Sequence, residues 1–173
     1  MRWLPCLSNF LRANGAFTSA VALACCAWPL ASAQPGPVAP IDFTFDAGFA
    51  CPGFPLRVQT FGGRLLTFNR ATGGTVTVIQ SGTFVVYTNT STGATFEQHT
   101  AGSVTTTTPV SSSRVRAVSS GGNSPIFFPT DSPPTSTIYY LGRVTYFVDQ
   151  PGNIFTLAGS VGKRYDVCAE LAG

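Results

Sequence analysis

Charged side chains are scarce in this chain of 173 residues: Asp, Glu, Lys and Arg together make up only 10% of it. Among its ten basic residues a single one, Lys163, is a lysine. Proteins that bind nucleic acids or anionic membrane surfaces concentrate positive charge, and this chain has no such concentration. We therefore expect no nucleic-acid partner and no membrane partner for the mature protein.

Metal-binding patterns are equally sparse. His99 is the only histidine, and no Cys-x-x-Cys pair occurs, so a zinc site is not expected. Asp42 and Asp46 have the spacing of the first ligands in a calcium loop. Such a loop needs Gly at its sixth position and Glu at its twelfth, where this chain has Ala47 and Gly53. We expect no metal and no cofactor.

Helical periodicity is missing as well, and short alternating stretches take its place. Ile41–Asp46 alternates apolar and polar residues with the period of two that is typical of a half-buried strand. Glycine-containing turn signals then recur about every ten residues, which is typical of strands joined by tight hairpins. The sequence predicts one all-β domain over residues 41–173, an antiparallel sandwich or barrel of eight to ten strands.

Some stretches carry more detailed expectations. Ile138–Val148 is the longest apolar run, so we expect a central strand, with a bulge at Gly142. Thr105–Ser113 is a Thr/Ser tract, and its sequence fits either an edge strand that leads into a loop or a disordered segment. Gly121–Asn123 is expected to be a turn, and Tyr165–Leu171 a single helical turn.

Residues 1–33 have the pattern of a secretory signal peptide. A positively charged leader precedes the apolar run Ala16–Leu30, and Ala31-Ser32-Ala33 offers a small-x-small cleavage site. The run has 15 residues, fewer than the roughly 18 to 20 that span a bilayer. A retained anchor and a lipoprotein are the alternatives. We expect removal of this segment and secretion of the mature protein.

The mature chain would begin with the Pro-rich lead-in 34–40 and would keep only two cysteines, Cys51 and Cys168. It would carry eight basic and seven acidic residues, a net charge of +1, and no tryptophan. Because disulfides persist outside the cell, we expect a Cys51–Cys168 disulfide that encloses almost the whole domain. Two free thiols and an intermolecular disulfide remain the alternatives.

Two parts of the chain resemble a known group of proteins. The Phe-Asp-x-Gly-x-x-Cys pattern within 43–58, together with the late Asp-x-Cys that ends at Cys168, is similar to small exported proteins that are common in actinomycetes. That group has no assigned function. The resemblance therefore implies secretion and the disulfide, and it implies no active site.

Candidate catalytic residues are few. On a strand, Glu97 and His99 would point to the same side while Phe96 and Gln98 point to the other. A carboxylate beside an imidazole could act as a general acid–base pair, although the same pattern fits a solvated strand face. No Gly-x-Ser-x-Gly motif accompanies the histidine. Catalysis is therefore the less favoured interpretation.

Binding is the favoured function. Tyr139, Tyr140 and Arg143 combine aromatic and arginine side chains, the types that are enriched in binding hot spots. The sequence therefore favours a non-catalytic module that binds an extracellular protein or glycan. The alternatives are a secreted protease inhibitor that uses the loop Phe128–Thr135, and a small hydrolase or lyase that uses Glu97 and His99.

Overall fold

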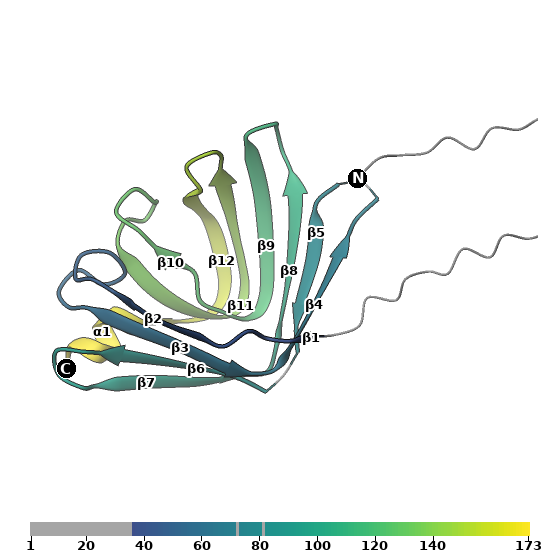
Figure 1. Cartoon of the computed structure of the whole chain (residues 1–173). Helices are drawn as coiled ribbons and strands as arrows, with labels where there is room; N and C mark the ends of the chain where they lie inside the picture. The colour runs from purple at the N-terminus through teal and green to yellow at the C-terminus, as the bar shows by residue number, and fades with distance from the viewer. Residues whose placement is uncertain (1–35, 72, 81) are drawn as a thin grey trace, which may run out of the picture. The chain divides into compact units, whose positions relative to one another are not determined.

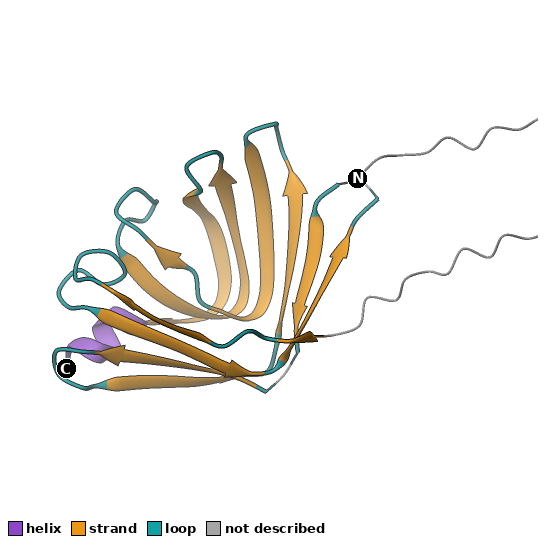
Figure 2. Cartoon of the chain, viewed as in Figure 1, coloured by secondary structure: helices purple, strands orange, loops and turns teal. Residues whose placement is uncertain are grey.

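The computed structural model describes residues 36–71, 73–80 and 82–173, so the predicted signal peptide lies outside the described residues. The described part forms twelve strands and one short helix, arranged in two antiparallel sheets (Figures 1 and 2). The predicted all-β class is confirmed. The two sheets form a sandwich-like arrangement and do not close into a barrel. No helix in this part is both long and apolar enough to cross a membrane.

The smaller sheet has four strands in the order β2-β3-β6-β7. Its strands are β2 (Ile41–Phe45), β3 (Leu56–Gly62), β6 (Thr83–Asn89) and β7 (Thr95–Thr100). Strand β2 pairs only with β3, so it is an edge strand of this sheet. Its first residue follows Pro40, which has no backbone N–H to offer to a further strand.

The larger sheet has eight strands, and β11 (Ser136–Asp149) lies between two neighbours, as predicted for the long apolar run. On one side β11 pairs with β12 (Ile154–Asp166), and on the other with β9 (Arg114–Asn123) and the short β10 (Ile126–Phe127), which continues the register of β9. Beyond β9 follow β8 (Ser103–Pro109), β5 (Thr75–Ile79), β4 (Arg64–Asn69) and β1 (Gly36–Pro37).

Several detailed expectations need correction. Strand β8 pairs with both β5 and β9, so the Thr/Ser tract contributes an interior strand and is neither an edge nor disordered. Gly121–Asn123 belongs to β9 and is not a turn. The register shift in β11 falls between Thr145 and Tyr146, away from Gly142. Gly36 and Pro37, within the predicted lead-in, pair with β4.

Glycines allow close backbone contact between β9, β11 and β12, the strands that curve away from the level of the smaller sheet (Figure 1). Gly142 lies opposite both Gly121 and Gly162 in the strand register, and all three have positive φ. A Cβ atom at Gly142 would collide with the carbonyl oxygen of Val161. Only glycine fits there, because it combines positive φ with no side chain.

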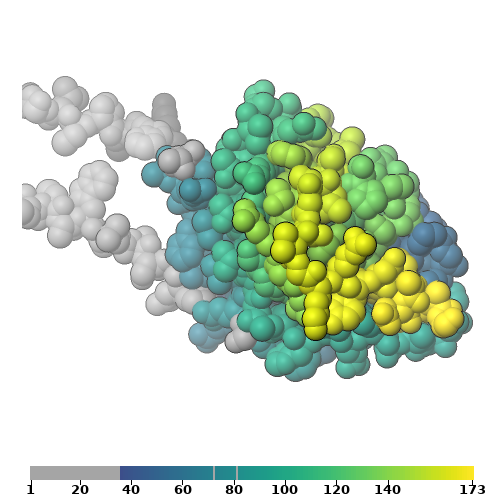
Figure 3. All heavy atoms as spheres, turned by 180° about the vertical axis from the view of Figure 1, so that it is seen from behind, coloured from purple at the N-terminus to yellow at the C-terminus, as the bar shows by residue number. Residues whose placement is uncertain are grey.

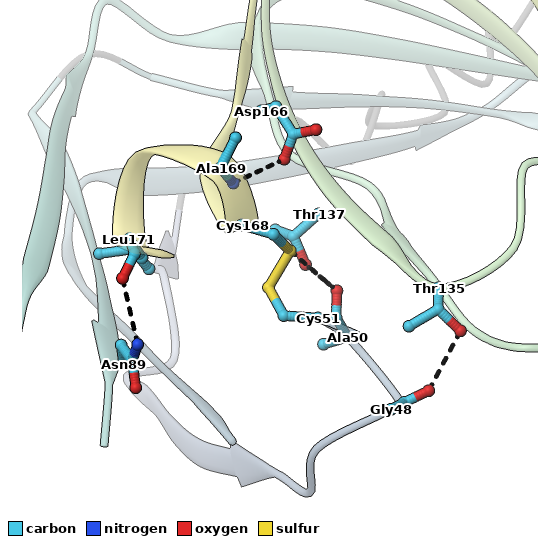
Figure 4. Close-up of a disulfide and its surroundings, with 10 residues drawn as sticks. All are labelled: Gly48, Ala50, Cys51, Asn89, Thr135, Thr137, Asp166, Cys168, Ala169 and Leu171. Carbon is cyan, nitrogen blue, oxygen red and sulfur yellow. Dashed lines mark hydrogen bonds between the residues drawn. A yellow bond between two sulfur atoms is a disulfide. The ribbon is translucent and has the colours of Figure 1, made fainter. Parts of the chain in front are cut away.

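The buried core lies between the smaller sheet, one end of β11 and α1 (Val167–Ala172). Its largest buried side chains come from all three: Leu56 on β3, Tyr87 on β6, Tyr139 on β11 and Leu171 on α1. The predicted Cys51–Cys168 disulfide is confirmed, and both cysteines belong to this core (Figure 4).

Hydrogen bonds reinforce this junction of the two chain ends (Figure 4). Thr137 Oγ1 donates to the carbonyl oxygen of Ala50 at 3.0 Å, and Asn89 Nδ2 donates to that of Leu171 at 3.1 Å. Asp166 caps α1 by accepting from the backbone N–H of Ala169. Seen from the opposite side, β12 and α1 lie at the surface of the domain (Figure 3).

Candidate functional site: an apolar groove between the sheets

The apolar inner face of the smaller sheet is left open at its β2 edge. Phe43, Val58 and Tyr87 stand side by side on β2, β3 and β6, and they point toward the larger sheet. Tyr87 is 1% exposed and Val58 7%, but Phe43 is 56% exposed. Ile41, two residues before Phe43 on the same face, is 50% exposed. This apolar face is therefore buried at Val58 and Tyr87 and exposed along β2.

This opening forms a groove of about 530 Å³ that is lined mainly by aromatic rings. Phe43 and Phe45 from β2 meet edge to face with ring centroids 4.8 Å apart. The ring of Phe128, from the loop after β10, lies 5.6 Å from that of Phe45. Phe49 adds a fourth ring and is 52% exposed. We call this opening, together with a second pocket that shares Phe43 and Phe45 with it, the inter-sheet groove.

The inner pocket of the groove has a volume of about 270 Å³ and shares Phe43 and Phe45 with the outer part. Its wall is again mostly apolar, with Val85 and Ile126 among the lining residues. Three lining residues carry hydroxyl groups: Thr60, Tyr87 and Ser124. Thr60 Oγ1 accepts a hydrogen bond from the backbone N–H of Ile41 at 3.2 Å. The oxygens of Tyr87 and Ser124 are buried, and the Ser124 side chain interacts with the Tyr87 phenol, which opposes the rise in the Tyr87 pKa that burial causes.

The electrostatics of the groove are simple. Among the residues that the structure describes, Asp46 at the outer mouth is the only charged one that lines either part. Arg57, the cation of β3, points to the opposite face of the sheet, where it forms a bidentate pair with Asp42 at 2.7 and 2.8 Å. That pair holds the pKa of the Asp42 carboxyl below its usual value. Burial raises the pKa of the Tyr87 phenol, so this group is neutral at physiological pH.

The wall that carries Phe128 is fixed by a buried carboxylate. Asp131, only 6% exposed, accepts hydrogen bonds from the backbone N–H groups of Phe128 at 2.7 Å and Phe155 at 2.8 Å. Thr135 Oγ1 also donates to the carbonyl oxygen of Gly48 at 3.1 Å. The loop Phe128–Thr135, suggested above as an inhibitor's contact segment, is thus tied to β12 and to the segment after β2.

Glu97 and His99 lie elsewhere, on the outer face of the smaller sheet. Both are exposed, and both point away from the half-buried Phe96, as the strand pattern predicts. The His99 ring stacks on Phe84 at 4.4 Å, and Phe84 stacks on Phe61 at 5.5 Å. Neither Glu97 nor His99 lines the inter-sheet groove.

Tyr139, Tyr140 and Arg143 do not form a shared exposed surface. Tyr139 is 1% exposed and packs in the core, where its ring lies 6.4 Å from that of Tyr165. Tyr140, the next residue on the strand, is 2% exposed, and burial raises the pKa of its phenol. Arg143 is exposed and lines a separate surface depression together with Arg116.

The groove residues were not among the candidates that the sequence suggested. The alternation of Ile41, Phe43 and Phe45 predicted a strand with one apolar face, and that face was assumed to be covered. The one available signal was Pro40, since a strand that begins after a proline is often an edge strand.

Among the described residues, no three His, Cys, Asp or Glu side chains gather in a way that could hold a metal ion. The chain matches no protein-family model, no curated protein and no solved structure. The resemblance to small exported proteins therefore stays a prediction, and the site has to be interpreted from its own geometry.

Proposed function

We propose that this chain is an exported, non-catalytic binding module that holds its ligand in the inter-sheet groove. The observation that carries the proposal is the exposure of Phe43, which shares a face with the buried Val58 and Tyr87 but is 56% exposed. A soluble domain gains free energy by covering such side chains. Large exposed apolar patches are typical of interaction surfaces and ligand grooves.

The groove is suited to binding because it is apolar and already formed. Fully burying a Phe side chain contributes about 1.5–3 kcal/mol, and both Phe43 and Phe49 are about half exposed. Covering these two rings would therefore contribute about 2 kcal/mol. Asp131 holds the Phe128 wall in place, so a ligand does not have to order this wall when it binds.

Two features support the extracellular location. The Cys51–Cys168 disulfide belongs to a class of bond that persists in oxidising compartments and is rare in the cytosol. Residues 1–33, outside the described residues, have the pattern of a signal peptide.

Nothing in the lining of the groove suggests catalysis. Within the described part of the chain, the residues that line its two parts include neither histidine nor cysteine, and Asp46 is the only carboxylate among them. Glu97 and His99 lie outside the groove on an exposed face. The geometry therefore favours binding.

A fluorescence titration with Nile red, a neutral dye that brightens in apolar sites, tests the proposal. We expect saturable binding to the wild-type mature protein and a roughly tenfold weaker affinity for Phe43→Ser, because about half of one Phe side chain is lost from the contact. Phe84→Ser is the matched control, since Phe84 is 42% exposed but lies on the outer face. It should leave the dye affinity unchanged.

Equal dye affinities for the wild type and Phe43→Ser would contradict the proposal. So would equal losses in the two variants, because the binding surface would then not be the groove. Thermal unfolding of each variant confirms that the comparison is made on folded protein.

A further inference from the structure

We propose that the inter-sheet groove binds an extended segment of another protein, which joins the smaller sheet as a further strand beside β2. This inference rests on the proposed function and adds the chemical class of the ligand, a polypeptide in the β conformation. The observation that leads to it is that the groove follows the uncovered edge of β2 and not its inner face alone.

The lining of the outer part shows which side of β2 the groove follows. Four consecutive residues, 43–46, line it, and the first three belong to β2. Successive side chains of a strand point to opposite faces of the sheet, so a groove on one face would meet only every second residue. One edge of β2 is covered by β3, and no strand of the described part covers the other. The groove therefore runs along the uncovered edge.

This edge carries backbone groups that can form hydrogen bonds. In an antiparallel pair, every second residue directs its N–H and C=O toward the partner strand, and the residues between direct theirs away. The N–H of Ile41 is directed toward β3, since it donates to Thr60 Oγ1 at 3.2 Å. By alternation, the N–H and C=O groups of Asp42 and Thr44 point away from β3. An added peptide strand would pair with them, which is how uncovered sheet edges bind extended peptides.

The opposite wall of the groove has little backbone to offer a ligand. It consists of residues 128–130, in the loop after β10. The N–H of Phe128 donates to Asp131, and its carbonyl oxygen accepts from the backbone N–H groups of Asp131 and Thr135. Pro129 has no N–H. A peptide in the groove would therefore pair its backbone with β2 and meet this wall with side chains.

The side chains around the groove set the sequence pattern of the ligand. Phe43 and Phe45 lie on the inner face, and residues of an added strand on that face would lie beside their rings. Every second residue of the ligand should therefore be apolar, and those between, beside Asp42 and Thr44, should be polar. Asp46 favours a basic residue at the adjacent end. The five residues of β2 offer about 17 Å of edge, enough for about five ligand residues.

Displacement of Nile red by two isomeric peptides tests the inference. Both have the sequence acetyl-Lys-Val-Thr-Val-Thr-Val-Lys-amide; one is N-methylated at its two threonines and the other at its second and third valines. Each isomer has two blocked N–H groups, all on one edge. With the valines in the groove, only one edge of the peptide can face β2. We expect one isomer to bind at least tenfold more tightly than the other, in which two backbone hydrogen bonds are blocked.

The edge of β2 is tested in the same assay with Thr44→Pro, which removes an N–H that points away from β3. Proline is tolerated at such edge positions. The affinity of this variant for the preferred isomer should fall about three- to tenfold, which corresponds to one neutral hydrogen bond, while its affinity for Nile red stays within twofold. Thr44→Val is the matched control, since it keeps the N–H and should bind the peptide as the wild type does.

Equal displacement by the two isomers would overturn the inference, and so would displacement by neither or unchanged peptide affinity in folded Thr44→Pro. If Thr44→Pro does not fold, the comparison of the isomers on wild-type protein decides alone. A wild-type dimer that Thr44→Pro dissociates, observed by analytical ultracentrifugation, would make a second copy of the chain the occupant and would also overturn it. These outcomes are distinct from failure of the proposed function, in which Nile red does not bind or binds Phe43→Ser as tightly as the wild type.

Discussion

Removal of the Cys51–Cys168 disulfide should cost this domain a large part of its stability. The disulfide joins residues 117 positions apart, so it restricts nearly the whole unfolded chain. The chain-entropy relation for a loop of this length gives a stabilisation of about 5 kcal/mol at 25 °C. Single domains have unfolding free energies of about 5–15 kcal/mol. The disulfide thus contributes a third or more of the stability of a typical domain.

The suitable variant is Cys51→Ala/Cys168→Ala. Cys51 is fully buried and Cys168 is 9% exposed, so alanine avoids the buried hydroxyl that serine would introduce. Urea unfolding of the mature protein, followed by circular dichroism, should show the unfolding free energy reduced by about 3–5 kcal/mol. The unfolding free energy should also fall more steeply with urea concentration, because the unfolded chain without the disulfide exposes more surface.

Thr137→Val is a useful comparison, because it removes only the hydrogen bond to Ala50 and keeps the disulfide. Its expected cost is about 1–3 kcal/mol, since the carbonyl oxygen of Ala50 loses this buried partner. If the unfolding free energy of the double-alanine variant is less than about 1 kcal/mol below that of the wild type, the reasoning is refuted. The two chain ends would then be held by packing and hydrogen bonds, and the disulfide would add little.

Three further predictions concern particular residues of the fold. Gly142→Ala should destabilise the domain by about 1–3 kcal/mol, through backbone strain and the collision with β12. Gly159→Ala, with open space around it, should cost less than about 1 kcal/mol. Equal losses of unfolding free energy for the two variants in urea would contradict the close approach of the backbones at Gly142. Asp131→Ala should lower the unfolding free energy by about 2–4 kcal/mol, because two backbone N–H groups lose their charged acceptor. Asp46→Ala, at an exposed position, should leave it nearly unchanged in the same assay. Burial raises the pKa of Tyr87 above its usual value of about 10, so the unfolded state releases this proton first as the pH rises. The unfolding free energy should therefore fall above pH 10 by up to about 1.4 kcal/mol per pH unit for this group. If the unfolding free energy of Tyr87→Phe falls just as steeply with pH, Tyr87 is excluded as the cause.

Much of the fold could be predicted because it depends on local sequence patterns. The alternation in Ile41–Phe45 and the apolar run within β11 indicated strands, and the structure places both there. The disulfide followed from the two cysteines that remain after the predicted cleavage. The strand alternation also indicated that Glu97 and His99 share one side, opposite Phe96, and of the two interpretations left open the structure shows the exposed one.

The errors arose where local patterns are ambiguous or where pairing is long-range. Gly121 sits in a sequence typical of a turn, yet here it lets β9 continue past a close contact with its neighbours. The Thr/Ser tract has the composition of an edge or a loop, and only its pairing with β5 and β9 makes β8 an interior strand.

The groove was missed for a related reason. The apolar face of β2 is the same whether or not an element packs opposite it, and the sequence of β2 alone does not reveal which case holds. Its exposure follows from the position of β2 at the edge of the smaller sheet, which is set by pairing with β3.

The central claim, that the inter-sheet groove is the binding surface, is tested most directly by nuclear Overhauser effects in mature protein with isotope-labelled phenylalanine and bound Nile red. The account predicts contacts between the dye and the rings of Phe43, Phe45 and Phe128, which line the groove. Contacts with Phe61 and Phe84 instead, the stacked rings on the outer face, would contradict it.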